Sequence, residues 1–414
     1  MNTCSAISAQ LVTAQNKSEL LSGTPAFFKL ICNLLLRLEF GNVILNLPDG
    51  RSLRFSGARE IDAVGIVNIR DFTFARRTVL GSDLGFFESY AQEEWDTPQL
   101  ADCLYIFARN ADRIQSAFHA HPVIGWAEQL RHYLRKNTHA GARKNIMAHY
   151  DLGNEFYEKW LDTGMTYSSA LFRPDTLNLE EAQLQKYQTL ANTMMIGPND
   201  EVLEIGSGWG GFAEFTARDI GAHITSITIS KAQFEYAQKR IFKAGLNERV
   251  NLELRDYRDM SGTFDKIASI EMYEAVGKEY WSDYFAKISQ CLKPGGSVGI
   301  QAITIAERYV KDYERSPDFI QRHVFPGGML ASPSEIFKRL RAVGLFHSSA
   351  MPFGLDYART LLTWHERFLE AWEEIKPLGF DQRFKKTWQF YLAYCEAGFR
   401  AATTDVYQIC AVKN

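Results

Sequence analysis

The chain has 414 residues, which is too long for one ordinary compact domain and predicts two. Hydrophobic residues make up 46% of the chain and charged residues 23%, as in typical water-soluble globular proteins. The formal net charge of -3 argues against broad nucleic-acid binding, so we expect no nucleic-acid partner. The six cysteines form neither a CxxC pair nor a His/Cys cluster at metal spacing. We therefore expect reduced thiols in a reducing compartment and no metal site.

Residues 1–24 are polar and have no clear periodicity, so we expect them to be poorly ordered. They lack the basic and apolar regions of a signal peptide. No apolar run in the chain reaches the roughly 18 residues that a membrane span needs. Any contact of this chain with a membrane is therefore expected at the membrane surface.

Residues 25–120 have the pattern of a small α+β domain. Residues 25–41 place apolar side chains at helical spacing, namely Phe27, Phe28, Ile31, Leu34, Leu35 and Leu38. This helix either packs on its own domain or lies at a membrane interface. Residues 42–57 alternate apolar and polar side chains around Pro48-Asp49-Gly50, which predicts a β-hairpin. The remaining elements are expected as strands over 65–80 and as helices over 84–95 and 97–110.

Residues 121–142 are interpreted as a basic helical linker to a second domain. Seven basic residues, histidines included, lie between Arg131 and Lys144. Such a run is usually a solvated face, and the alternative is contact with anionic lipid headgroups.

The second domain, residues 143–414, alternates short β-rich runs with helical stretches. The β-rich runs are 201–208, 223–230, 250–257, 264–272 and 297–305. Strand-helix alternation predicts an α/β fold with a doubly wound, mostly parallel sheet and helices on both faces.

The first of these runs, Val202-Leu203-Glu204-Ile205, leads into the turn Gly206-Ser207-Gly208-Trp209-Gly210-Gly211. Glycines allow a tight turn and the close approach of a ligand to the backbone. The acidic Glu204 and this spacing resemble the first motif of class I S-adenosylmethionine methyltransferases, and no P-loop GK[ST] sequence is present. Further groups follow the second and third strands and are expected to contact ribose and adenine. They are Thr228 with Ser230, and Asp256 with Tyr257.

The motifs that flank the glycine turn narrow the resemblance. They occupy residues 149–157, 165–170, 228–233, 256–259, 270–277, 319–328 and 356–361. In this order they resemble the cyclopropane-fatty-acyl-phospholipid synthase family, strongly over residues 143–414. The N-terminal part is similar to the small lipid-associated domain of the full-length bacterial enzymes. The resemblance implies a Rossmann-like class I methyltransferase fold with a smaller N-terminal α+β domain.

The family resemblance also implies an activity. A carbon derived from the methyl group of S-adenosyl-L-methionine is added to the cis double bond of an unsaturated phospholipid acyl chain. The resulting carbocation loses a proton to bound bicarbonate or an equivalent base and closes to a cyclopropane. The implied bicarbonate cage consists of Glu274, Tyr357, the backbone at Ile303, Ser169 and Gln301.

Two cage positions depart from the family pattern. Ser169 stands where the family usually has Cys, and Gln301 stands where it usually has His. A Gln amide can donate a hydrogen bond to an oxyanion but cannot carry a positive charge. We therefore expect weaker anion binding or a different base. The alternative product is a C-methylated acyl chain without ring closure.

The resemblance implies one set of cofactor-binding residues: Tyr167, Ser168, Glu204, Gly206, Gly208, Thr228, Ser230, Gln233, Asp256 and Tyr257. Cys395 matches a cysteine once considered catalytic in the family. A thiol nucleophile has no step in the expected chemistry, so a structural thiol is the preferred interpretation.

The implied partner is the unsaturated phospholipid acyl chain at a membrane surface. The implied location is the cytoplasm, peripherally on the inner face of the membrane. The family, rather than any residue pattern, suggests a homodimer. The rival hypotheses are a small-molecule methyltransferase, which would turn over soluble acceptors, and a lipid-binding protein with a decayed site, which would not bind S-adenosylmethionine.

Overall fold

The computed structural model describes residues 9–114, 152–175, 178–315 and 317–414. Two compact units account for the chain, Met1–His139 with Phe380–Ala401 and Ala140–Gly379 with Ala402–Asn414. The first unit therefore recruits a late segment that the sequence analysis placed in the second domain. The basic linker predicted at 121–142 lies outside the described residues.

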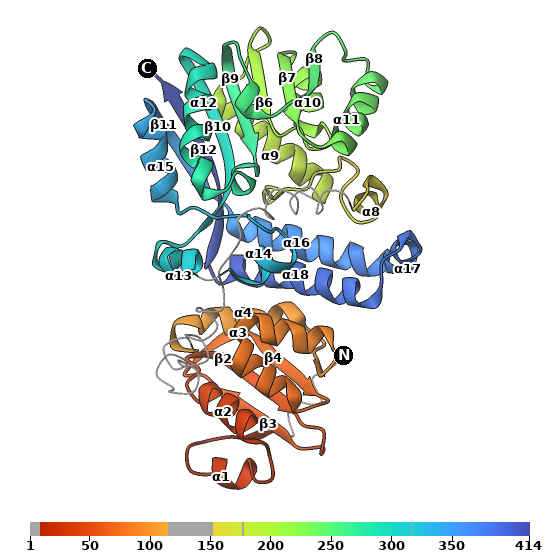
Figure 1. Cartoon of the computed structure of the whole chain (residues 1–414), viewed down its shortest axis with the longest axis vertical. Helices are drawn as coiled ribbons and strands as arrows, with labels where there is room; N and C mark the ends of the chain where they lie inside the picture. Colours follow the sequence, from red (N-terminus) through yellow and green to blue (C-terminus); the bar gives the residue numbers. More distant parts are fainter. Residues whose placement is uncertain (1–8, 115–151, 176–177, 316) are drawn as a thin grey trace. The chain divides into compact units, whose positions relative to one another are not determined.

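The first unit contains a five-stranded sheet in the order β1-β3-β2-β4-β5. Its strands are β1 (Gln10–Leu11), β2 (Phe40–Asn46), β3 (Ser52–Ser56), β4 (Arg59–Ile69) and β5 (Trp95–Asp96). Its helices are α1 (Lys17–Leu20), α2 (Ala26–Leu35), α3 (Thr73–Ala91), α4 (Leu100–Arg109) and α18 (Gln382–Arg400). The predicted hairpin is confirmed, because β2 and β3 pair antiparallel with Leu45 opposite Leu53. Figure 1 shows this sheet together with α3 and α4.

In three segments of the first unit, contacts with the rest of the unit explain the local structure. The N-terminal residues include β1 and α1, and the residues that directly follow them, Val12 and Leu21, are buried and hold this segment in the unit. The strand expected over 65–80 ends at Ile69, and α3 follows from Thr73. The side chain of Asp71 accepts hydrogen bonds from the N–H and hydroxyl of Thr73, which satisfies a donor at the start of this helix. In α2 the Phe28 ring packs against Phe72 with centroids 5.0 Å apart, so its apolar face is used within its own unit.

The second unit contains a seven-stranded sheet in the order β11-β12-β10-β9-β6-β7-β8. Its strands are β6 (Glu201–Ile205), β7 (His223–Thr228), β8 (Val250–Leu254), β9 (Phe264–Ile270), β10 (Leu292–Ile305), β11 (Leu345–Pro352) and β12 (Thr404–Lys413). All five predicted strands are present and pair parallel. The additional strand β12 pairs antiparallel with both β10 and β11.

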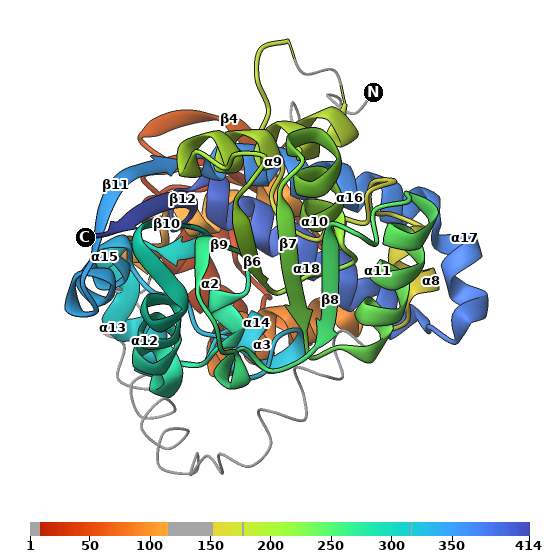
Figure 2. The same ribbon diagram turned by 90° about the horizontal axis from the view of Figure 1, so that it is seen from above.

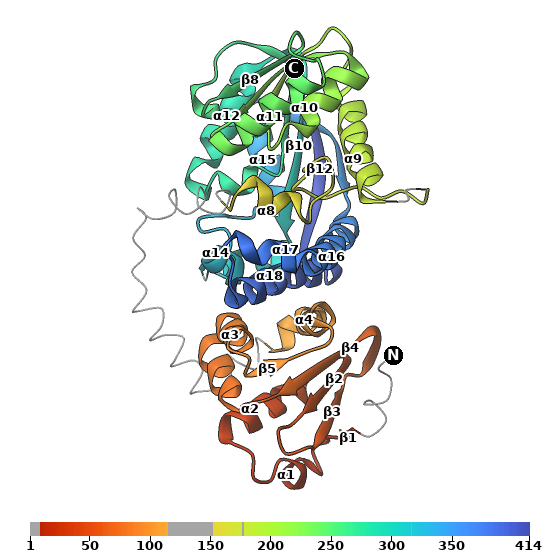
Figure 3. The same ribbon diagram turned by 90° about the vertical axis from the view of Figure 1, so that its right-hand side faces the viewer.

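Helices cover both faces of this sheet. The α-helices described in the second unit are α8 (Asn154–Glu158), α9 (Leu179–Met194), α10 (Gly211–Phe215), α11 (Lys231–Lys243), α12 (Trp281–Cys291), α13 (Val310–Arg315), α14 (Phe319–His323), α15 (Pro333–Ala342), α16 (Gly354–Glu370) and α17 (Trp372–Ile375), and only some of them lie on the sheet faces. Figures 2 and 3 show α9 on one side of the sheet and α12 with α15 on the other.

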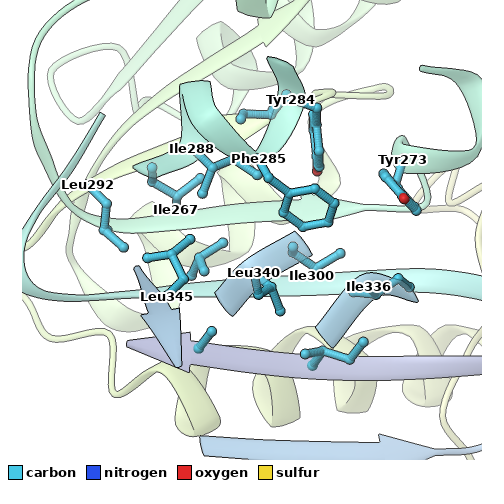
Figure 4. Packing of buried hydrophobic residues seen from close by; sticks show 14 of the residues in the cluster. Ile267, Tyr273, Tyr284, Phe285, Ile288, Leu292, Ile300, Ile336, Leu340 and Leu345 are labelled. Carbon is cyan, nitrogen blue, oxygen red and sulfur yellow. The ribbon is translucent and has the colours of Figure 1, made fainter. Parts of the chain in front are cut away.

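Two buried clusters explain this three-layer arrangement. Adjacent residues of a strand point to opposite faces, so Val202 joins the cluster under α9 and Leu203 joins the cluster under α12. Figure 4 shows the second cluster, in which Ile267 and Ile300 of the sheet meet Phe285 of α12. The predicted doubly wound α/β fold with a smaller α+β domain is confirmed. Its parallel strands end at one edge, which is where such sheets bind ligands.

Candidate active site

The glycine turn follows β6 at this edge. Gly206 and Gly208 have φ angles of 95° and 48°, a left-handed backbone region that favours glycine. The N–H groups of Gly206 and Ser207 donate to the Ile227 carbonyl at 3.0 and 2.8 Å, which fixes the turn to β7. A Cβ atom on Gly208 would meet nothing within 4 Å, so the backbone is open to a ligand there. A Cβ atom on Gly206 would lie 3.1 Å from the Met272 Cγ atom.

Below the turn, Glu204 is a buried carboxyl group. The Ser226 hydroxyl donates to its Oε2 atom, and burial raises its pKa to about 8. Since Glu204 is almost entirely buried on β6, it supports the sheet beneath the turn. Glu204 therefore acts on the ligand-binding edge by supporting the strand that precedes the glycine turn.

Side chains after β7 and β8 form the next parts of the edge. The Thr228 hydroxyl donates to Gln233 Oε1 at 3.0 Å and accepts from the Ser230 N–H at 3.1 Å. After β8, the Asp256 carboxylate forms an ion pair with Arg258, and the Tyr257 ring packs on Tyr284 with centroids 5.6 Å apart. The residues predicted to contact ribose and adenine therefore lie at or just after the ends of two neighbouring parallel strands, β7 and β8.

The remaining predicted cofactor residues lie in the segment between α8 and α9. The Tyr167 ring contacts Tyr157 and Trp364, with centroids 5.4 and 5.3 Å away. The Ser168 hydroxyl accepts a hydrogen bond of 2.7 Å from the Lys186 ammonium group. Lys186 is fully buried, and burial lowers its pKa to about 7. The negative charge of Glu271 acts in the opposite direction and favours the ammonium form.

Glu271, which directly follows β9, is the centre of a network of hydrogen bonds. Its Oε1 atom accepts from the Ser169 N–H at 2.9 Å and from Gln301 Nε2 at 2.8 Å. Its Oε2 atom accepts from the Tyr357 hydroxyl at 2.6 Å. The residue has a φ angle of 49°, and its N–H donates to the Gln301 carbonyl at 2.8 Å. Strand β10, helix α16 and the segment before α9 thus meet at one carboxylate.

The amide of Gln301 is held from its other side. Gln301 Oε1 accepts a hydrogen bond of 3.1 Å from Gln408 Nε2 on β12. Its Nε2 group must therefore point towards Glu271. Gln301 and Ser169 are fully buried, and the Tyr357 side chain is almost so. Burial raises the pKa of Glu271, while the hydrogen bonds from Tyr357 and Gln301 and the charge of Lys186 lower it.

Glu274 lies three residues further on, in the short helix Tyr273–Ala275. Its Oε1 atom accepts a hydrogen bond from the Ile303 N–H. Its Oε2 atom is buried and has no hydrogen-bond partner among the described residues. Burial, followed by the charge of Glu271, raises the pKa of Glu274 to about 8. The carboxyl groups of Glu271 and Glu274 thus differ in their surroundings. Three hydrogen-bond donors surround Glu271, whereas Glu274 accepts from the Ile303 N–H alone among the described residues.

The predicted catalytic residues are divided between the two units. Glu274, Gln301, Tyr357, Ser169 and Ile303 belong to the second unit. Three of them, Ser169, Gln301 and Tyr357, donate to Glu271, and the Ile303 N–H donates to Glu274. Cys395 lies on α18 of the first unit. The sequence analysis missed Glu271 and Lys186 as site residues. The signal for Glu271 was a second acidic residue within the 270–277 motif, directly after a strand. In the described parts of the chain, no group of His, Cys, Asp and Glu could hold a metal ion.

The sheet order and the glycine turn define a class I S-adenosylmethionine-dependent methyltransferase. A family model described as mycolic acid cyclopropane synthetase matches residues 137–409. The chain therefore belongs to this family of S-adenosylmethionine-dependent methyltransferases, and the predicted resemblance is confirmed.

Individual relatives agree with this assignment. The chain is 37% identical to tuberculostearic acid methyltransferase UfaA1 of Mycobacterium tuberculosis, over 93% of this chain and 91% of that protein. It is 32% identical to cyclopropane-fatty-acyl-phospholipid synthase of Escherichia coli, over 83% of this chain and 86% of that protein. Among solved structures, cyclopropane synthase MmaA2 from Mycobacterium tuberculosis has a TM-score of 0.62 at 26% identity, over 67% of this chain and all of that chain. Mycolic acid cyclopropane synthase CmaA1, complexed with SAH and CTAB, has a TM-score of 0.61 at 25% identity, over 65% of this chain and 98% of that chain.

Proposed function

We propose that this enzyme methylates the cis double bond of an unsaturated phospholipid acyl chain, with S-adenosyl-L-methionine as the methyl donor. The observation that carries the proposal is the closeness of Gly206 to Met272, whose Cγ atom would lie 3.1 Å from a Cβ atom on Gly206. It puts the cofactor turn directly against the segment that bears Glu271 and Glu274. The names of the relatives support a lipid acyl substrate, since they describe fatty acyl and mycolic acid enzymes.

The chain's residues fit the cofactor. Gly208 leaves the backbone accessible, and Thr228, Ser230 and Gln233 supply neutral polar groups for a ribose. The other residues proposed to hold it are Tyr167, Ser168, Glu204, Asp256 and Tyr257. When bound, S-adenosyl-L-methionine supplies an electrophilic methyl group on a sulfonium centre. The enzyme then aligns the double bond with this group, excludes water from the cation, and provides a base.

Bicarbonate does not fit as the base. The resemblance assigned it to donors at Ser169, Gln301 and Tyr357, but these groups already donate to the Glu271 carboxylate. We therefore derive no step through bicarbonate.

Two products follow from the same cation. Loss of a proton with ring closure gives a cyclopropane, which is the product we propose first. The second candidate is a C-methylated chain without ring closure. It is favoured by the 37% identity to tuberculostearic acid methyltransferase over 93% of this chain.

The proposal places the enzyme at the inner surface of the cytoplasmic membrane, as a peripheral protein. None of the helices in the described ranges is long and apolar enough to cross a membrane. The suggested homodimer stays part of the proposal, and light scattering of the purified protein tests it.

The deciding experiment incubates the purified protein with methyl-labelled S-adenosylmethionine and vesicles of unsaturated phospholipid. Mass spectrometry should find acyl chains heavier by one labelled carbon unit, and NMR then distinguishes a ring from a branch. Vesicles of saturated phospholipid are the control and should stay unlabelled. Labelling of soluble acceptors in place of lipid would contradict the proposal and favour a small-molecule methyltransferase.

A further inference from the structure

We infer that the Glu271 carboxylate is a built-in replacement for bicarbonate and serves as the catalytic base of this enzyme. The inference rests on the proposed function. It makes the reaction independent of any external anion and assigns a catalytic role to a residue outside the implied cage.

The hydrogen bonds carry the inference. Three of the five groups assigned to the cage, Ser169, Gln301 and Tyr357, donate to one carboxylate of the chain itself. An ionised carboxylate offers about four lone-pair positions, so about one stays open when three are occupied. The three donors therefore favour the ionised form against the effect of burial, and the carboxylate still has room to accept a proton.

The charges around the three donors favour the Glu271 carboxylate alone over Glu271 together with a bound bicarbonate. A second anion bound at these donors would meet the Glu271 carboxylate at close range in a buried setting, where like charges repel strongly. The nearby cation is the buried ammonium group of Lys186, which acts on Glu271 and is bound to the Ser168 hydroxyl. Gln301 is a neutral donor, and a neutral donor is sufficient when the anion is tethered to the chain.

Glu274 is the competing base, and its surroundings disfavour it. It accepts one hydrogen bond, from the Ile303 N–H, and its Oε2 atom is buried without a partner in the described chain. A carboxyl group in such a place prefers its neutral form. Glu274 is therefore assigned as a neutral acid beside the Glu271 anion.

The step balances as a simple deprotonation. A C–H bond of the substrate cation breaks, either at the added methyl group or at a neighbouring carbon. Its electron pair closes the ring or forms a new double bond, and the proton goes to Glu271. The neutral carboxyl group returns the proton to solvent after the product leaves. No further reactant is needed.

The test compares turnover in bicarbonate-depleted buffer with turnover in millimolar bicarbonate. The wild-type enzyme should label lipid at the same rate in both. Glu271→Gln should lose about 100-fold or more, because it keeps the shape but cannot take the proton. Glu366→Gln is the matched control, since Glu366 is exposed on α16, and it should keep full activity.

A second variant tests anion binding at this site independently of turnover. Glu271→Gly suits the φ angle of 49° and frees the three donors. Titration with ¹³C-bicarbonate, followed by NMR, should detect binding to Glu271→Gly but not to the wild type. Bicarbonate should also restore its turnover by about tenfold or more. Binding of S-adenosylhomocysteine by all variants establishes that they are folded.

Several results would overturn the inference. They are a wild-type rate that depends on bicarbonate, full activity of Glu271→Gln without it, or no bicarbonate binding to Glu271→Gly. The proposed function fails separately, if the wild-type enzyme labels no lipid in either buffer.

Discussion

Replacement of Tyr357 by Phe should move the pH dependence of turnover upwards. The substitution removes the hydroxyl group that donates to Glu271 at 2.6 Å and leaves the ring in place. A hydrogen bond to a charged group contributes about 1.5–3 kcal/mol, and each pKa unit corresponds to about 1.4 kcal/mol. The Tyr357 side chain is buried, so solvent does not replace the lost donor. The pKa of Glu271 should therefore rise by about one to two units.

The sign follows from the role of the base. Turnover requires the ionised carboxylate, so a higher pKa reduces the rate at pH values below the new pKa and leaves it unchanged well above it. Below the original pKa the loss should reach about 10- to 100-fold. The assay is the rate of lipid labelling across a pH series, with Tyr90→Phe in the first unit as the control. An unshifted profile of Tyr357→Phe would show that this hydrogen bond does not tune the catalytic base.

Three further predictions address other parts of the second unit. Glu274→Gln should keep affinity for S-adenosylhomocysteine in calorimetry and keep most lipid labelling, because a neutral amide replaces a neutral carboxyl group and can still accept from the Ile303 N–H; loss of most labelling would contradict the neutral assignment of Glu274. Gly206→Ala should weaken cofactor binding by about tenfold, because the new Cβ atom lies 3.1 Å from Met272 at a φ angle of 95°; unchanged affinity in the same titration would refute the placement of the turn. Gly299→Ala should destabilise the enzyme by about 1–3 kcal/mol, since its Cβ atom would overlap the Met194 side chain and lie 2.9 Å from the Leu190 Cδ1 atom; a thermal melt equal to that of the wild type would contradict this.

Much of the fold followed from local patterns. The runs that became β6 to β10 are short and apolar and are separated by helical stretches, so the parallel sheet was predictable. The start of α3 was not, because Phe74, Ala75 and Val79 are equally compatible with a buried strand until Asp71 supplies the hydrogen bonds at the helix start. The recruitment of α18 by the first unit depends on long-range contacts, which no local pattern contains.

The candidate site divides in the same way. The glycine turn could be predicted from the sequence, because the close approach of a ligand to the backbone requires glycine at fixed spacing. The roles of Glu271 and Lys186 could not, because a carboxylate in a motif gives no direction for its side chain. Lys186 lies on α9, and its role became visible only in the structure, from its hydrogen bond to the Ser168 hydroxyl and its complete burial.

The two departures from the family pattern gain a physical meaning from this network. The sequence suggested that Gln301, as a neutral residue, would weaken a bound anion or require a different base. In the structure its amide is oriented by Gln408 and donates to Glu271, which needs only a donor because the chain itself prevents its loss. Ser169 contributes its backbone N–H, while its hydroxyl donates to the Ala170 carbonyl, so the side chain at this position is free to differ from Cys. A covalently tethered anion thus relaxes the demand for charge and for a specific side chain at the positions that hold it.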